Sequence, residues 1–494
     1  MPFVAPYLDY HAFAPELVLI ATFVAVLVAD LIGERNKPLL GTIAGLGLLG
    51  SMVPVLTLAV ADEPVRAMFG GGYVVDNFAL TLKALFIIGG YVVILLSTNY
   101  IAEGDFWEGE YYLMLLASIL GMTMMASSRD LVLIFVALEL LSIPAYMLAT
   151  WRKRDPKSNE AGLKYYLMGV FATAIMLYGM SLIFGVTGQT GLAAIAASPA
   201  IAGTAPVITL GVVFVIAGFG FKVSAVPFHT WAPDTYEGAP TPVTAFLSVA
   251  SKAGGFVALT SLCLVGFATQ EEVWQPLFWV LAALSMTVGN LLALRQTNIV
   301  RMLAYSSVAQ GGYMLAPLAV AGHSIDGRRE SIGALVVYLL VYGAMNLGAF
   351  AIVIAVARKT RSGEISSYGG LFQYAPGLTV VMTVFVFALA GIPPLGGWFA
   401  KFVIFKALVN PGTSAGYALA IVVGVNSVIA LFYYARIAQQ MWMQPVPDED
   451  RTPIRVPPSL VGALGICCLV TLVLGVLPGL VGEIGDLAEL ASGR

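Results

Sequence analysis

Long apolar runs, separated by short charged or proline- and glycine-rich breaks, fill most of this sequence of 494 residues. A run of about 20 apolar residues can cross the hydrocarbon core of a bilayer as a helix. Fourteen segments are expected to do so: 15–32, 38–61, 73–98, 111–127, 129–151, 160–187, 206–228, 241–267, 274–294, 299–321, 331–357, 373–409, 415–443 and 456–480. The chain is therefore expected to be an all-α polytopic membrane protein.

Composition supports lipid as the main solvent of this chain. Hydrophobic residues make up 59% and charged residues only 11%, whereas soluble domains carry about 25% charged residues. The net charge of −3 and the absence of a basic stripe also exclude a nucleic-acid-binding protein.

The orientation follows from the basic residues outside the apolar segments. Most of them lie in the loops that follow odd-numbered segments, which places those loops in the cytoplasm. Both termini are then expected to be periplasmic, in a bacterial inner membrane. The first segment carries Glu16 and no basic region before it, so it is expected to be a retained helix and not a signal peptide.

The sequence predicts no cofactor and no metal on this chain. Its three cysteines all lie inside apolar runs, and its three histidines are far apart. Neither spacing fits an iron–sulfur cluster, a zinc site or a bis-histidine haem.

Six lysines lie inside the expected spans, where an ammonium group costs about 2.5–3.5 kcal/mol near mid-membrane. They are Lys83, Lys164, Lys222, Lys252, Lys401 and Lys406. Intramembrane charges of this kind usually face a bundle interior and mark ion or proton routes. Glu139 is the one central carboxylate expected to stand against them.

Three of the six lysines also have an ordinary structural interpretation. Lys164 and Lys406 lie close enough to a span end to extend to the interface. Lys83 could be a structural lysine bound to backbone carbonyls. Lys222 and Lys252, like Glu139, lie too deep in their segments to extend to the interface, which favours a functional role.

The first backbone interruption lies beside Lys222. Pro227 cannot donate a hydrogen bond to the carbonyl of Val223, and Pro144 likewise frees the carbonyl of Leu140 in the Glu139 segment. Desolvation disfavours an ammonium group, while a carboxylate or free carbonyls favour it. A lysine held between these effects can gain or lose a proton when a neighbour such as Glu139 changes charge.

The second interruption lies in the motif GIPPLGG at 391–397. Its two prolines free the carbonyls of Leu389 and Ala390 shortly before Lys401. The run 373–409 is also too long for one straight span, which indicates a broken helix. Two broken helices, five spans apart and each with a lysine, are typical of an internally repeated transporter. The alternative is a pair of kinks that only assist packing.

These motifs together resemble the proton-conducting antiporter-like family, which comprises subunits of respiratory complex I and of Mrp cation/proton antiporters. The resemblance covers roughly 110–440 and rests on LELLSIPAY at 138–146, AGFGFKVSAVPFHTWAPD at 217–234, GAPTPVTA at 238–245, NIVRMLAYSSVAQ at 298–310 and AGIPPLGGWFAK at 390–401.

Within the family, the chain is most similar to the subunit-N branch of NADH-quinone oxidoreductase. Its length leaves no room for the extra C-terminal helices of the L subunit. Lys401 stands where the M subunit has glutamate. Ser248 stands where L and M subunits tend to carry histidine, and the charge of that helix lies one turn later, at Lys252.

The resemblance implies two inverted five-helix repeats, formed by helices 4–8 and 9–13, with helices 7 and 12 broken. The expected parts of the chain are an N-terminal three-helix unit at 1–110, the first repeat at 111–267, the second repeat at 274–443, and a C-terminal helix and tail at 444–494.

The resemblance also implies a role for each buried charge. Glu139 and Lys222 would form a switching pair, Lys252 the central relay, Lys401 the terminal group from which protons leave, and Lys164 a modulator of Glu139. His229 is either a connector of this route or a structural hydrogen-bonding residue. No role follows for Lys83 or Lys406.

A non-redox, proton-translocating subunit of the complex I membrane arm is the function that the resemblance implies. Flavin (FMN), iron–sulfur clusters and quinone are then expected on other subunits. Neighbouring antiporter-like and small membrane subunits are the expected partners, within the lipid bilayer. The alternatives are an Mrp-type Na⁺/H⁺ antiporter subunit and a passive scaffold whose charges only fasten its neighbours.

Overall fold

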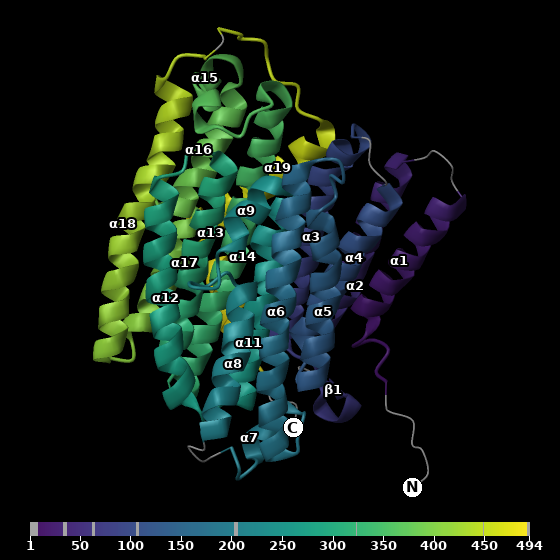
Figure 1. Ribbon diagram of the computed structural model, residues 1–494, viewed down its shortest axis with the longest axis vertical. Helices are drawn as coiled ribbons and strands as arrows, with labels where there is room; N and C mark the ends of the chain where they lie inside the picture. Colours follow the sequence, from purple (N-terminus) through teal and green to yellow (C-terminus); the bar gives the residue numbers. More distant parts are fainter. Residues whose placement is uncertain are drawn as a thin grey trace.

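The computed structural model describes residues 8–32, 37–61, 65–104, 108–201, 206–322, 324–447 and 449–491. Long helices run side by side along one axis (Figure 1). In this described part, eleven helices are long and apolar enough to cross a membrane. The expectation of an all-α polytopic membrane protein is therefore confirmed.

The N-terminal part holds three long helices and a small antiparallel hairpin. In chain order its elements are α1 (Ala14–Ile32), α2 (Lys37–Ala59), β1 (Arg66–Met68), η1 (Phe69–Gly71), β2 (Tyr73–Val75) and α3 (Asn77–Ala102). Asp76 begins α3 as its N-cap, because its side chain accepts a hydrogen bond from the Ala79 N–H.

The middle part runs from α4 to a helix with two π-helical turns, η2 and η3. Its elements are α4 (Glu108–Ser127), α5 (Leu131–Ala149), α6 (Pro156–Thr187), α7 (Leu192–Ala197), α8 (Pro206–Lys222), α9 (Trp231–Gly238), α10 (Thr241–Phe246), η2 (Leu247–Ser251), α11 (Lys252–Ser261) and η3 (Leu262–Gly266).

The last part contains the second interrupted helix and the C-terminal helices. Its elements are α12 (Glu271–Leu294), α13 (Ile299–Leu315), η4 (Ala316–Val320), α14 (Ile325–Thr360), η5 (Ile365–Tyr368), α15 (Leu371–Tyr374), α16 (Pro376–Ala390), α17 (Gly396–Val409), α18 (Ser414–Met443), α19 (Pro458–Val476) and α20 (Pro478–Leu487).

Three of the fourteen expected spans are absent from the eleven clear candidates. In each of the three, the helix is interrupted or changes type. The segment 206–228 contains α8 and then turns, 299–321 joins α13 to η4, and 373–409 is divided into α16 and α17. The number of spans and the two inverted repeats therefore stay predictions.

Both expected breaks are present in the backbone. Helix α8 ends at Lys222, and turns lead from it to α9. Helix α16 ends at Ala390, after which Gly391 adopts a left-handed φ of 93°. A Cβ on Gly391 would also lie 2.8 Å from Cδ of Lys401. Only glycine fits there, because a side chain would be strained and would displace the lysine.

The first and last described segments of the chain both lie at the end of the bundle that carries the β1–β2 hairpin (Figure 1). Asp9 accepts a hydrogen bond from Arg66 at 3.1 Å, and the N–H of Ala491 donates to Asp76 at 2.8 Å. We call this the hairpin end.

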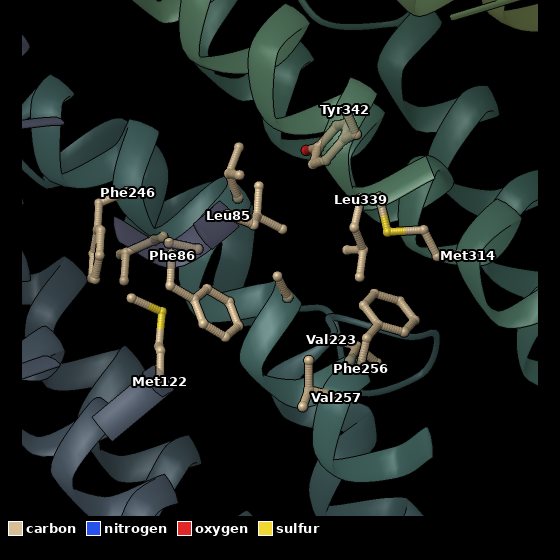
Figure 2. Packing of buried hydrophobic residues seen from close by; sticks show 14 of the residues in the cluster. Leu85, Phe86, Met122, Val223, Phe246, Phe256, Val257, Met314, Leu339 and Tyr342 are labelled. Carbon is tan, nitrogen blue, oxygen red and sulfur yellow. The ribbon is translucent and has the colours of Figure 1, made fainter. Parts of the chain in front are cut away.

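Two segments form the centre of the bundle. The apolar window of the continuous segment from α10 to η3 is 100% buried, and that of α14 is 89% buried. Helix α14 contacts α3, α10, α16, α17 and α19. Figure 2 shows apolar side chains of these central helices packed against one another. Lys252, the charged residue of the segment from α10 to η3, is therefore removed from the lipid-facing surface.

Candidate functional site: a line of buried lysines

Lys222, the last residue of α8, is held by hydroxyl groups and aromatic faces. Its Nζ lies 2.7 Å from Oγ of Ser142 and 3.5 Å from the hydroxyl of Tyr165. The ring centres of Tyr146 and Tyr165 lie 5.6 and 5.7 Å from the same atom. The side chain is buried, so its ammonium group depends on these few contacts in place of water.

Glu139 lies on α5, one helical turn before Ser142. Among the described residues no ion pair joins Glu139 to Lys222, and Oε1 of Glu139 is buried without a hydrogen bond. The two residues share Ser142 as a neighbour, because it lies on the helix of the carboxylate and binds the lysine. The structure therefore brings the expected pair together, with Ser142 as the group that touches the lysine.

Lys252 opens α11, directly after the π-helical turn η2. Its Nζ lies 2.6 Å from both the carbonyl oxygen and Oγ of Ser307 on α13. The Tyr342 hydroxyl donates to the same Oγ at 3.1 Å. A serine on a neighbouring helix therefore supplies both of the recorded acceptors of this buried lysine.

Two glycines allow the first two lysines to approach each other. A Cβ on Gly255, one turn after Lys252, would lie 3.2 Å from Cβ and Cγ of Lys222. A Cβ on Gly311 would lie 3.0 Å from the Val223 carbonyl oxygen and 3.9 Å from Nζ of Lys252. The helix that carries Lys252 therefore packs directly on the stem of Lys222.

Lys401 uses a carbonyl that the proline motif leaves free. Its Nζ donates to the Ala390 carbonyl at 2.8 Å, and it lies 4.9 Å from the centre of the Tyr313 ring. The second freed carbonyl, that of Leu389, accepts from Nε2 of Gln310 at 3.3 Å. Both carbonyls predicted from Pro393 and Pro394 are thus bonded inside the bundle.

One face of α13 links Lys252 to Lys401. Ser307 binds Lys252, Gln310 follows one turn later, and Tyr313 lies beside Lys401. Gln310 also donates to the Tyr434 hydroxyl at 3.3 Å and accepts from Tyr338. Sequence reasoning missed this polar face, although polar residues three apart in an apolar helix are a signal for it.

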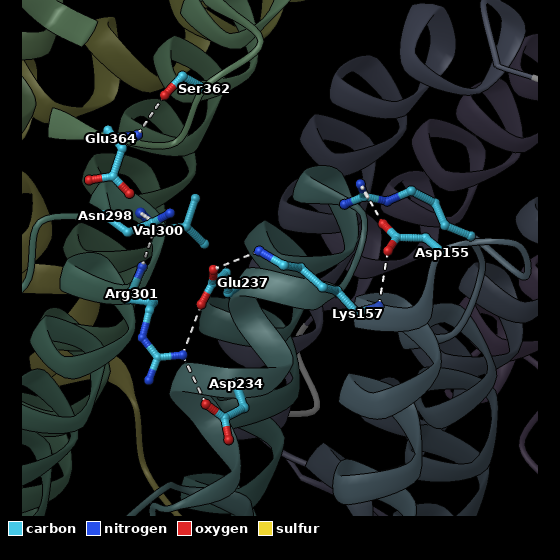
Figure 3. Close-up of polar contacts among 10 residues, drawn as sticks. Asp155, Lys157, Asp234, Glu237, Asn298, Val300, Arg301, Ser362 and Glu364 are labelled. Carbon is cyan, nitrogen blue, oxygen red and sulfur yellow. Dashed lines mark hydrogen bonds and ion pairs between the residues drawn. The ribbon is translucent and has the colours of Figure 1, made fainter. Parts of the chain in front are cut away.

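Lys164 lies in a separate ion-pair network, at the end of the bundle opposite the hairpin. Its Nζ is 2.7 Å from Asp234 and 2.7 Å from Glu160. Arg301 bridges Asp234 and Glu237 at 2.8 Å each (Figure 3). Among the described residues Lys164 has no ion pair with Glu139, so its role as a modulator stays a prediction.

Partial burial raises the pKa of Asp234, which lies beyond the expected span 206–228, but its partners outweigh that effect. Hydrogen bonds from Lys164 and Arg301 hold the pKa of this carboxyl below its usual range. The network therefore stays charged at neutral pH.

His229 lies in the turns between α8 and α9, where its Nδ1 is buried without a hydrogen bond in the described part of the chain. Its ring centre is 6.5 Å from that of Tyr305. Within the described ranges no contact joins His229 to the buried lysines, and its role stays a prediction.

The two lysines without an assigned role have different surroundings. Lys406 is half exposed and lies 3.4 Å from Glu330, as expected for an interfacial side chain. Lys83 is fully buried and lies 2.9 Å from Glu16, not against backbone carbonyls. Glu139 is therefore not the only carboxylate inside the bundle that lies near a lysine. The sequence did not reveal the second pair, because it does not show which helices become neighbours.

Metal chemistry gains no support from the described residues, in which no group of three or more His, Cys, Asp or Glu side chains could hold an ion.

The chain is similar to known membrane subunits of quinone oxidoreductases. A family model described as "NADH:quinone oxidoreductase/Mrp antiporter, TM" matches residues 128–430. NADH-quinone oxidoreductase subunit N of Trichlorobacter lovleyi is 39% identical over 477 residues, 95% of either chain. NAD(P)H-quinone oxidoreductase subunit 2 of a Synechococcus species is 40% identical over 486 residues, 96% of this chain and 90% of that one.

Two solved structures share the fold. A chain of respiratory complex I from Thermus thermophilus matches with a TM-score of 0.77 at 30% identity, over 95% of this chain and 98% of that one. A chain of the Mrp complex from Dietzia matches with a TM-score of 0.86 at 20% identity, over 97% of each. At 20% identity, the second likeness concerns the fold alone.

Proposed function

This chain belongs to the family of NADH:quinone oxidoreductase and Mrp antiporter membrane subunits, and from that premise we propose that it is a proton-translocating membrane-arm subunit of NADH:quinone oxidoreductase, complex I. Relatives about 40% identical over nearly the whole chain carry the names of quinone oxidoreductase subunits. The Mrp likeness rests on the family model, whose description names both kinds of protein, and on a shared fold at 20% identity. The subunit-N branch is therefore favoured over an Mrp-type Na⁺/H⁺ antiporter.

The observation that carries the proposal is the line of buried lysines joined by α13. A proton that leaves the ammonium of Lys222 passes toward Lys252, whose neighbour Ser307 is a hydroxyl group able to donate and accept. Gln310 and the tyrosines around it continue the polar path to Lys401. Each transfer breaks one N–H bond and forms another, so each lysine gains the proton that the previous one loses.

Glu139 is suited to start the sequence. It lies on α5 among exposed apolar side chains, including Val136 and Ile143, which are 46% and 51% exposed. That surface is where a neighbouring antiporter-like or small membrane subunit would pack. A charge change on such a neighbour would weaken the hold of Glu139 on Lys222, which then releases its proton.

The energies involved are of matching size. Moving one charge against 100 mV costs about 2.3 kcal/mol. Coupling between sites is typically about 1–3 kcal/mol. A few coupled lysines can therefore transmit enough free energy to move a proton across the membrane.

Redox chemistry is assigned to other subunits in this proposal. FMN, iron–sulfur clusters and quinone would be bound there, and this chain would be the non-redox part of the enzyme. The hairpin end would face the periplasm and the network around Asp234 the cytoplasm, since most loop arginines and lysines lie at the latter end.

The test uses the assembled complex in membrane vesicles. Glu139→Gln or Lys222→Ala is expected to lower the number of protons pumped per NADH oxidised, because each removes one member of the switching pair. Normal stoichiometry in an assembled complex would overturn the scheme. Sodium-dependent pH homeostasis without NADH oxidation would favour the antiporter instead, and intact pumping in Lys401→Ala would favour a passive scaffold.

A further inference from the structure

A second fully buried ion pair lies in the N-terminal helices, outside the matched residues 128–430. Oε1 of Glu16 on α1 is 2.9 Å from Nζ of Lys83 on α3, and both side chains have no exposed area. The Lys83 ammonium also donates to the Tyr73 hydroxyl at 2.9 Å, with the Tyr73 ring centre 5.1 Å away. Three titratable groups from three elements therefore meet in an apolar interior.

The carboxylate of this pair has spare capacity for a proton. Within the described residues, both oxygens of Glu16 are buried: Oε1 pairs with the Lys83 ammonium, and no hydrogen bond reaches Oε2. The aligned hydrogen bond of Lys83 goes to Tyr73 instead. A buried carboxylate oxygen without a donor is a natural site for a proton or a water molecule.

Packing alone does not explain such a pair. Buried ion pairs are often no more stable than well-packed apolar residues of similar volume, and intramembrane charges commonly serve proton transfer. Glu16 can bind one proton by forming an O–H bond while Lys83 stays an ammonium, and it can release that proton again.

Polar groups lead from the pair to the hairpin end. The Tyr73 hydroxyl accepts from Lys83. Tyr73 also pairs with Ser128 in an isolated antiparallel bridge, next to Ser127, whose hydroxyl is buried. Two residues beyond Ser127, Arg129 forms a buried ion pair with Asp76 at 2.9 Å. A proton on Glu16 therefore has hydroxyl groups on its way to that end.

Helix α3, which carries Lys83, also packs on the segment that carries Lys252. Helix α3 packs on α10 and η2, the turns directly before that lysine. Leu85, two residues after Lys83, and Val249 would lie 3.3 and 3.4 Å from a Cβ on Gly343. Figure 2 shows Leu85 and Phe86 within the same cluster as Phe246. Arg129, which pairs with Asp76, also donates to the hydroxyl of Ser261, the last residue of α11, at 3.4 Å.

We propose that Glu16 and Lys83 form a further proton-exchanging pair of this subunit, which exchanges protons with the hairpin end through Tyr73 and is coupled to Lys252 through the contact of α3 with η2. The inference rests on the proposed function, since it adds a site to the same proton translocation. The alternative is a purely structural ion pair, called a clasp below, that only holds α1 against α3.

The test compares Glu16→Gln, Lys83→Met and the double variant in the assembled complex in vesicles. A clasp predicts that the double variant, which leaves no unpaired charge, recovers the pumping that a single variant loses. Proton exchange predicts that Glu16→Gln and the double variant both pump about tenfold more slowly, as for one barrier raised on the route. Recovery in the double variant would overturn the proposal.

Tyr73→Phe keeps the ion pair and removes the hydroxyl, so it tests the route without an assembly risk from buried charge. It is expected to slow proton uptake at constant NADH oxidation, and an unchanged rate would overturn the route through Tyr73. An infrared carboxylic-acid signal that appears during turnover and is lost in Glu16→Gln provides a readout besides activity. Its absence from the unmodified complex would contradict protonation of Glu16.

Two controls separate the possible failures. The partly exposed pair Glu330 and Lys406 receives the matched change, Glu330→Gln with Lys406→Met, and the complex is expected to pump normally. Glu139→Gln is measured in parallel. If it pumps normally, the proposed function fails; if it loses pumping while the Glu16 and Lys83 double variant pumps normally, only this inference fails.

Discussion

The ammonium of Lys401 donates to the carbonyl of Ala390, 2.8 Å away and eleven residues earlier in the chain. That carbonyl is available because Pro394, four residues after it, has no N–H to offer. A charged side chain thus replaces a missing backbone donor at the break between α16 and α17.

Restoring the backbone donor at this break should weaken the lysine site. Pro394→Ala supplies an N–H that competes with Lys401 for the Ala390 carbonyl, and about a tenfold fall in pumping rate is expected, equivalent to about 1.4 kcal/mol. Pro276→Ala, an exposed proline inside α12, is the control. Equal pumping by both variants in assembled complexes would contradict the role of the freed carbonyl.

Gln310 is expected to matter because it joins the two halves of the path. Gln310→Leu removes the donor to the Leu389 carbonyl and the acceptor of the Tyr338 hydroxyl. Each lost hydrogen bond typically costs about 0.5–1.5 kcal/mol. Proton pumping should fall while NADH oxidation with an uncoupler persists. Gln275→Leu, which also loses one bond to a backbone carbonyl, should leave pumping intact.

The close approach of Lys222 and α11 can be tested with a methyl group. Gly255→Ala places a Cβ 3.2 Å from the stem of Lys222 and 3.0 Å from Val223, so the lysine has to shift away from Ser142. A several-fold loss of pumping is expected, measured as proton uptake per NADH. Gly424→Ala in α18 meets nothing within 4 Å and serves as the matched control. No difference between the two would show that this spacing is unimportant.

Lys164 and Lys222 should respond differently to the same substitution. Lys164 is 42% exposed and bound to Asp234 and Glu160, whereas Lys222 is buried. Lys164→Met is therefore expected to reduce pumping less than Lys222→Met. If Lys164→Met matched Glu139→Gln instead, the modulating role predicted from the sequence would gain support over a purely structural one.

The network around Asp234 should confer a pH-dependent stability. Its partners lower the pKa of Asp234 in the folded protein, below the value of about 3.9 for a free carboxyl. The contribution is therefore present above that value and is lost as pH falls through the lower folded pKa. The thermal midpoint of the purified complex should drop more steeply on acidification than that of Asp234→Asn. Parallel curves would contradict this assignment.

The two helix breaks could be located from the sequence, because proline lacks a backbone N–H whatever the tertiary structure. The carbonyls of Leu389 and Ala390 could be named as free from Pro393 and Pro394 alone, and the structure shows both bonded by side chains of the bundle. Which side chains bond them could not be named, since Gln310 is about 80 residues away and reaches Leu389 only in the assembled bundle.

Glu16 shows the opposite case. Its place in an apolar segment was visible in the sequence. Its partner Lys83 lies on another helix, and the number of residues between them does not indicate that they pair. The same holds for Ser307 as the acceptor of Lys252, 55 residues away. Pairings of this kind depend on which helices become neighbours.

By itself, the sequence determined the solvent of this protein, the apolar helices, the two breaks and the deep charges, because hydropathy and proline chemistry act locally along the chain. Only the tertiary structure decided the partner of each charge. In a bundle where almost every helix is apolar all round, hydrophobic pattern does not specify which faces meet, so side-chain fit and the need to satisfy buried polar groups select the neighbours.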